Sequence, residues 1–372
     1  MFSDFALLSS SGLLHLTTGN IVMWLIGSVL IYLAIAKQYE PLLLLPIGFG
    51  IILANLPLSG LMEPGEGLVW RFYHYGIQWE IIPPLIFLGL GALTDFGPLL
   101  TKPILIFLGA GAQVGVYLIF FIAYLMGYDI REAATIGIIG GADGPTTIFL
   151  ASKLAPHMLG TCAVAAYSYM AMVPIIQPPI MKLLTTKEER VIKMKKTRKV
   201  TQLEKILFPI LTAILIIMLV PASAPLISMF MLGNLFRESK VVERLSHAAQ
   251  NELMNIVTIF LGISIGATMK AETFLQVKVI LIFFFGLFAF MVSTASGVLL
   301  AKLLNLFLKE KINPLVGAAG VSAVPMAARV VHKVGAEADK KNYLLMYAMG
   351  PNVAGVIGTV IAAGIFLTFL GG

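Results

Sequence analysis

Charged residues are scarce in this sequence. Only 12% of its 372 residues are Asp, Glu, Lys or Arg and 58% are hydrophobic, whereas soluble proteins average about 25% charged residues. This composition excludes a water-soluble globular domain. Because a helix needs about 20 mostly apolar residues to cross a bilayer, we expect an all-α membrane protein with about 10 to 12 transmembrane segments. Long apolar runs recur at Ile21 to Ala36, Leu42 to Leu58, Ile104 to Met126, Ile206 to Val220, Val279 to Leu300 and Val356 to Leu370.

Cysteine and the common motifs of soluble enzymes are also missing. Cys162 is the one cysteine, which excludes an internal disulfide and a metal site built from cysteines. The sequence has no glycine-rich loop of the kind that holds ATP phosphates, no His, Asp and Glu at metal-ligand spacing, and no nucleophile elbow. We therefore do not expect the chain to be powered directly by ATP.

Positive charge gathers in one segment. The net charge of +7 would suggest a nucleic-acid partner in a soluble protein, but here the charge is not spread over a groove-sized surface. Loops rich in Lys and Arg face the cytoplasm. We expect a cytoplasmic connector and no nucleic-acid partner. Between Thr185 and Lys205 lie Lys187, Arg190, Lys193, Lys195, Lys196, Arg198 and Lys199, against Glu188, Glu189 and Glu204.

The sequence indicates an internal repeat. Asn55 is matched by Asn234 about 180 residues later, and the Gly/Pro segment 140–145 is matched at that spacing by 320–325. Segment 89–92 is matched less closely by 265–267, about 175 residues later. These matches predict a first membrane repeat with an N-terminal helix at residues 1–184, the connector at 185–205 and a second repeat at 206–372. We expect inverted repeats, with broken or re-entrant helices at the centre, if the broken segment of each half does not cross fully.

Asp143 is the sharpest feature of the first broken segment. It stands between Gly140-Gly141-Ala142 and Gly144-Pro145-Thr146-Thr147, with apolar sequence on both sides. A carboxylate inside a membrane is costly and therefore suggests function. Helix-breaking Gly and Pro release backbone carbonyls, and these oxygens with a carboxylate suit a small hard cation. The alternative is a loop aspartate that caps the helix starting at Thr146.

The matching segment, Asn313 to Arg329, is rich in small residues that allow close backbone approach. Asn313 and Ser322 offer neutral oxygens, and Arg329 could hold a carboxylate. The alternatives are a serine that only packs between helices at Ser322 and a helix-end arginine that reaches to the membrane surface at Arg329.

Two more polar residues lie in apolar runs. Tyr169 has the character of an aromatic residue at the membrane interface. Asn352 follows Gly350-Pro351, where its amide could offer an ion ligand or simply satisfy a proline-linked kink.

These segments together resemble a known family. The motif Gly140-Gly141-Ala142-Asp143-Gly144-Pro145-Thr146, the segment Asn313 to Arg329 and Gly350-Pro351-Asn352 are similar to the beta subunit of the biotin-dependent, sodium-pumping decarboxylases. The resemblance covers nearly the whole chain.

The resemblance implies that the chain decarboxylates carboxybiotin and couples the release of CO2 to Na+ export. The biotin would be held by a partner carrier protein and charged by a carboxyltransferase (alpha) subunit. It further implies a small single-span membrane subunit (gamma or delta), a homo-oligomer, and a multi-pass location in the inner (cytoplasmic) cell membrane.

The resemblance also implies residue roles. Asp143, Asn313 and Asn352 would bind Na+, and Ser322 and Tyr169 would serve a second ion or a proton. Arg329 would meet the carboxyl group of carboxybiotin, so that Arg329, Asp143 and Tyr169 would form the catalytic set.

Two rival functions share part of this pattern. A sodium-coupled solute symporter or Na+/H+ antiporter would also have repeats, broken segments and an intramembrane aspartate. A membrane scaffold without transport would tolerate the loss of Asp143, but it leaves the buried charge unexplained.

Overall fold

The computed structural model describes residues 11–194 and 198–371, and within these ranges every regular element is helical. This confirms the expected all-α membrane protein. Residues 1–10 of the predicted first repeat, Gly372 of the second, and residues 195–197 of the connector, including Lys195 and Lys196, lie outside the described residues.

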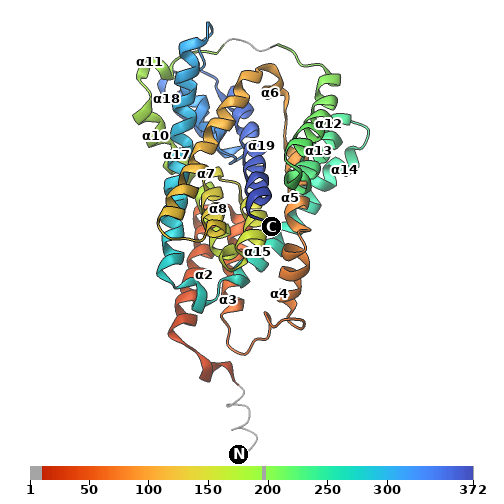
Figure 1. The fold of residues 1–372 in the computed structure, drawn as a ribbon, viewed down its shortest axis with the longest axis vertical. Helices are drawn as coiled ribbons and strands as arrows, with labels where there is room; N and C mark the ends of the chain where they lie inside the picture. The colour runs from red at the N-terminus through yellow and green to blue at the C-terminus, as the bar shows by residue number, and fades with distance from the viewer. Residues whose placement is uncertain (1–10, 195–197, 372) are drawn as a thin grey trace, which may run out of the picture.

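The first half of the chain begins at the bottom of Figure 1, rises to α6, returns to the middle with α7 and α8, and ends near the top with α10. Its elements are η1 (Gly12–His15), α2 (Thr18–Lys37), α3 (Pro41–Ala54), α4 (Leu68–Arg71), η2 (Phe72–Gln78), α5 (Ile82–Leu93), α6 (Gly97–Thr101), η3 (Pro103–Leu105), α7 (Ile106–Leu125), α8 (Ile130–Ile138), η4 (Ile139–Gly141), α9 (Gly144–Leu154), η5 (Pro156–Met158) and α10 (Leu159–Leu184).

The second half follows the connector. Its elements are α11 (Lys187–Arg190), α12 (Gln202–Leu219), η6 (Pro221–Ser223), α13 (Ala224–Ser239), α14 (Glu243–Ala248), η7 (Ala249–Leu253), α15 (Met254–Thr268), α16 (Ala271–Phe274), α17 (Val277–Phe307), η8 (Pro314–Gly320), α18 (Met326–Ala338) and α19 (Leu345–Leu370).

Seven helical stretches in the described ranges are long and apolar enough to cross a membrane, and an eighth is obtained if Leu68–Gln78 and Ile82–Leu93, bent by 64°, form one span. The remaining expected segments are short or interrupted. The helix α3 has 14 residues and α13 has 16, which is below the length of a full span. The number is lower than the predicted 10 to 12 because apolar composition does not reveal where a helix breaks.

Glycine allows two helix pairs to touch at their backbones. A Cβ atom added to Gly91 of α5 would lie 1.9 Å from the carbonyl oxygen of Phe230 in α13, and one added to Gly233 would lie 1.9 Å from that of Leu88. Likewise, a Cβ at Gly266 of α15 would lie 2.1 Å from a carbonyl oxygen of α3. Any side chain at these crossings would force the helices apart.

The two matched asparagines bind across the two halves in a reciprocal way. Asn55 donates to the carbonyl oxygen of Met269 at 2.9 Å and accepts from the amide of Ala271 at 2.9 Å. Asn234 donates to the carbonyl oxygens of Thr94 at 2.8 Å and Gly91 at 3.5 Å. Each asparagine therefore caps the end of a helix that belongs to the other half.

The connector is held against the second half. Asn342 donates to the carbonyl oxygens of Arg190 and Ile192, and Lys193 pairs with Asp339 at 3.1 Å. Hydrogen bonds from the backbone of Lys341 and from Lys193 lower the pKa of Asp339. Figure 1 places α11 and α18 at the end of the molecule opposite α2, α3 and α4.

We expect Asn55→Ala and Asn234→Ala to destabilise the protein by a similar amount, about 1 to 3 kcal/mol each, because each change leaves buried backbone groups of the other half without a partner. Thermal unfolding in detergent measures the effect. Asn251→Ala is the control, since Asn251 is exposed and its side chain donates to the carbonyl oxygen of His247, four residues earlier in the same half. Unfolding temperatures equal to that of the control would contradict the reciprocal capping.

Candidate functional site

The first broken segment turns within the molecule. The helix α8 tightens into η4, Ala142 adopts a left-handed conformation with φ 53°, and α9 begins at Gly144 with Pro145 in its first turn. A proline is well suited to this position because its missing N–H would have no helical partner there. The turn places Asp143 at the start of α9.

Asp143 is only 3% exposed. Its Oδ1 accepts a hydrogen bond from the backbone N–H of Thr146 at 3.2 Å, and its own carbonyl accepts one from the hydroxyl of Thr147 at 2.7 Å. Asp143 is therefore a helix cap, as the alternative interpretation held. A cap needs no burial, however, and a buried carboxylate calls for a counter-charge or further donors.

The second broken segment supplies one of these donors. The hydroxyl of Ser322 donates to Oδ2 of Asp143 at 3.0 Å, and the backbone N–H of Ser322 donates to the carbonyl of Gly141 at 2.9 Å. The two broken segments thus meet directly at Asp143, and Ser322 does more than pack between helices.

Asn352 joins the same region from α19. Its Nδ2 donates to the carbonyl oxygens of Val321 at 2.7 Å and Ala319 at 3.1 Å. The amide therefore binds the second broken segment. The alternative interpretation, in which the amide of Asn352 satisfies the kink at Pro351, is wrong. Its Oδ1 and the hydroxyl of Thr146 are buried without a hydrogen-bond partner among the described residues.

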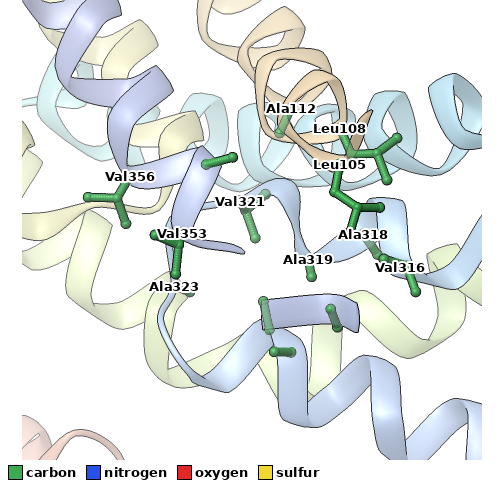
Figure 2. Packing of buried hydrophobic residues seen from close by; sticks show 14 of the residues in the cluster. Leu105, Leu108, Ala112, Val316, Ala318, Ala319, Val321, Ala323, Val353 and Val356 are labelled. Atoms are coloured by element: carbon green, nitrogen blue, oxygen red, sulfur yellow. The ribbon is translucent and has the colours of Figure 1, made fainter. Parts of the chain in front are cut away.

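Small side chains bring the backbones close around this contact. Figure 2 shows Ala318, Ala319 and Val321 between α7 and α19. A Cβ added to Gly355 of α19 would lie 2.1 Å from the carbonyl oxygen of Gly320. The second broken segment is thus enclosed by packed apolar groups, and its polar backbone must find partners within the protein.

Sequence reasoning missed Tyr167. A Cβ added to Gly144 would lie 2.2 Å from the ring of Tyr167, so this buried ring lies directly against the turn that carries Asp143. The signal was present in the sequence, because the glycine after Asp143 leaves room for a large neighbour. Nothing in the sequence indicated which aromatic residue would fill it.

Tyr169 lies elsewhere on α10. It is buried, its hydroxyl donates to the carbonyl oxygen of Phe283, and its ring packs against Gly286 of α17. The interpretation as an interfacial aromatic residue is therefore wrong. Residues two apart on a helix point to nearly opposite sides, which explains why Tyr167 and not Tyr169 contacts the Asp143 turn.

The structure does not place Asn313 beside Asp143. Its Nδ2 donates to the carbonyl oxygens of Arg190 at 2.8 Å and Ile192 at 2.9 Å, and its Oδ1 accepts from the N–H of Leu315. The seven residues of η8 separate it from the Ser322 region, a distance of about 14 Å at the rise of a 3-10 helix. Its role as a Na+ ligand stays a prediction.

Arg329 is exposed on the first turn of α18. It follows Ser322 by seven residues in the chain, and its helix α18 lies with α11 at the connector end of the molecule (Figure 1). The position leaves the guanidinium accessible from outside the protein core. Its role toward a carboxyl group likewise stays a prediction.

The donor set suits a monovalent cation. The described residues contain no group of three or more His, Cys, Asp or Glu that could hold a metal ion. One carboxylate with neutral hydroxyl and amide oxygens carries a single negative charge, which matches one Na+ as a transported ion better than a divalent ion.

Comparison with known proteins decides the family. The family model of the Na+-transporting oxaloacetate decarboxylase beta subunit matches residues 19–370. The chain belongs to this family. It is 57% identical to the glutaconyl-CoA decarboxylase subunit beta of Acidaminococcus fermentans, over 99% of this chain and 97% of the relative. The resemblance seen in the broken segments is confirmed, and the chain is the membrane subunit of a sodium-transporting decarboxylase; the candidate site at Asp143 lies in this subunit.

Other relatives carry different substrate names. The methylmalonyl-CoA decarboxylase subunit beta of Propionigenium modestum is 55% identical, over 97% of this chain and 98% of its own. The oxaloacetate decarboxylase beta chain of Klebsiella pneumoniae is 49% identical, over 98% of each chain. The membrane subunit is thus similar across systems named for different acids.

We expect Ser322→Ala to raise the Na+ concentration that gives half-maximal decarboxylation roughly tenfold, because the change removes a hydroxyl bonded to the buried carboxylate. Steady-state rates of the purified complex at varied Na+ measure this. Ser264→Ala is the control, since Ser264 is also buried and its hydroxyl has no hydrogen-bond partner among the described residues. Equal Na+ dependence in the two variants would remove Ser322 from the site.

Proposed function

We propose that this chain decarboxylates carboxybiotin held on a partner carrier protein and uses the reaction to export Na+. The observation that carries the proposal is the buried carboxylate of Asp143 at the contact of two broken segments, in a chain of the Na+-transporting family.

Na+ binding neutralises Asp143. One charge and several neutral ligands come from the two carboxylate oxygens, the hydroxyls of Ser322 and Thr146 and the amide oxygen of Asn352. Within the part of the chain that the structure describes, the Thr146 and Asn352 oxygens have no hydrogen-bond partner. Asn313 would join when the broken segments adopt another arrangement. Burying an unpaired carboxylate costs free energy, and a bound cation that neutralises the carboxylate offsets that cost.

A proton links the reaction to the ion. When carboxybiotin loses CO2, the N–C bond breaks, the electron pair stays on the ring nitrogen, and that nitrogen takes up one proton. A proton delivered from outside to Asp143 makes its carboxyl neutral and displaces Na+. Ser322, bonded to Asp143, and Tyr169 are the groups we assign to this exchange. For Tyr169 the role requires its bond to Phe283 to open.

Arg329 binds the carboxyl group of carboxybiotin. It is exposed on the first turn of α18, the helix that lies with α11 at the connector end in Figure 1, and its planar fork of donors matches a carboxylate. The carrier would reach it from the cytoplasm, because the basic connector marks that face by the positive-inside rule.

The assembly follows from this orientation. We place the chain as a multi-pass protein of the inner membrane, with the carboxyltransferase subunit and the biotin carrier on the connector face. The span in α12 is only 11% buried within the chain, and the one in α2 only 22%. These apolar faces suit lipid, a single-span gamma or delta subunit, or a second copy of the chain.

Inverted repeats would provide the movement. The reciprocal bonds of Asn55 and Asn234 and the meeting of the two broken segments support two halves related by a pseudo-twofold axis. Movement of one bundle against the other would then expose Asp143 to each side in turn.

We expect Asp143→Asn to lower Na+-dependent decarboxylation and 22Na+ uptake into liposomes roughly 100-fold, because the site loses its charge. Asp129→Asn is the matched control. Asp129 is an exposed aspartate that caps α8 as Asp143 caps α9, and Asn caps helices about as well as Asp. If Asp143 acted only as a cap, both variants would keep their activity.

The alternative is a Na+-coupled symporter or a Na+/H+ antiporter. Only the decarboxylase requires biotin, so a test of biotin dependence distinguishes the two functions. We expect avidin to abolish 22Na+ uptake by liposomes that contain the complete complex, because avidin sequesters the partner's biotin. Avidin already bound to free biotin is the control. Na+-coupled uptake of a solute by the isolated chain, insensitive to avidin, would favour the symporter.

A further inference from the structure

A buried glutamine, Gln177, binds the second broken segment at Ala318, four residues before Ser322. Gln177 of α10 is fully buried, and its Nε2 donates to the carbonyl oxygen of Ala318 in η8 at 2.9 Å and to the hydroxyl oxygen of Thr294 in α17 at 3.3 Å. Three elements that are distant in sequence therefore meet at this amide.

The amide oxygen of Gln177 differs from its nitrogen. Oε1 of Gln177 is buried without a hydrogen-bond partner among the described residues. The second buried glutamine of the same core differs in this respect. Gln113 of α7 donates to the carbonyl oxygens of Gly109 and Gly355, and its Oε1 lies 3.4 Å from the hydroxyl of Thr359, a donor that it shares with the carbonyl oxygen of Gly355. A buried carbonyl oxygen without a donor is costly, so Oε1 of Gln177 calls for a ligand.

Gln177 lies between the connector and Asp143. Ala318 is within η8, which begins after Asn313 at the connector and ends two residues before Ser322. Gln177 also lies five residues before Lys182, whose carbonyl oxygen is bonded by Arg190 of the connector, a distance of about 7.5 Å along a helix. An ion that moves along η8 from the connector to Asp143 therefore passes Gln177.

The helix α10 also has a backbone oxygen without its helical donor next to Gln177. The helix runs unbroken from Leu159 to Leu184 with Pro178 inside it. A proline inside a helix provides no N–H, so the carbonyl of Pro174, four residues earlier, lacks its usual donor.

We propose that Oε1 of Gln177 is a Na+ ligand at a transit position between the connector face and Asp143, completed by the hydroxyl of Thr294 and by backbone carbonyls. The inference rests on the proposed function. The position has no charge of its own, so it binds Na+ weakly, as transit sites must if the ion is to move on. Gln177 passes the ion to Asp143, where the carboxylate holds it.

The test uses the complete complex in liposomes, with 22Na+ supplied on the connector side. Gln177→Met keeps the approximate shape of the side chain and removes the oxygen. We expect the Na+ concentration for half-maximal uptake to rise about tenfold, while the maximal rate at saturating Na+ falls less than about threefold. Gln113→Met is the matched control and should leave the half-maximal concentration unchanged.

A second variant distinguishes a Na+-ligand role of the side-chain oxygen from a purely structural role of the amide nitrogen, which bonds to Ala318. Gln177→Glu keeps an oxygen and adds negative charge, so at neutral pH the half-maximal Na+ concentration should fall below that of the unaltered complex. If Gln177 only clamped Ala318, Met and Glu would both lower the maximal rate without opposite shifts in Na+ dependence. That result, or equal shifts in the Gln113 and Gln177 variants, overturns the inference.

Asp143→Asn in the same preparation separates this inference from the proposed function. If Asp143→Asn retains Na+-dependent decarboxylation, the proposed function fails. If Asp143→Asn is inactive and the Gln177 variants keep the half-maximal Na+ concentration of the unaltered complex, only the transit position fails.

Discussion

The contact between the two broken segments is the constraint on which the rest of the molecule depends. Ser322 joins them twice, through its hydroxyl to Asp143 and through its backbone N–H to Gly141. Broken helices expose polar backbone that a membrane cannot satisfy. The glycines, the small side chains of η8 and the amides of Asn352 and Gln177 all serve to enclose that backbone with partners.

Much of the fold could be predicted because membrane helices are determined by the composition of short stretches of sequence. Composition and apolar run length predict membrane helices, and the spacing of Asn55 and Asn234 marked two positions whose bonds are reciprocal in space. The number of full spans could not be predicted. Where a helix ends inside an apolar run depends on capping and packing, as in α3 and α13, rather than on hydrophobicity.

The site was predictable only where chemistry was conspicuous. A carboxylate between glycines in an apolar run identified Asp143, and its proline-containing counterpart identified Ser322. The sequence could not show that Tyr167 would cover Gly144, that Tyr169 would face α17, or that Asn313 would bind the connector. Those outcomes depend on which face of a helix meets which neighbour, and the neighbour here comes from distant parts of the chain.

The interlocking of the halves has a consequence for how the protein is made. The glycine face of α5 is completed by α13, and the glycine face of α3 by α15, so neither half contains its own partner for these surfaces. During synthesis, the first half enters the membrane before the second half exists. Until translation supplies α13 and α15, the glycine faces of α3 and α5 lack the helices that pack against them in the folded protein. The packing of the first half is therefore completed only after the second half has been made.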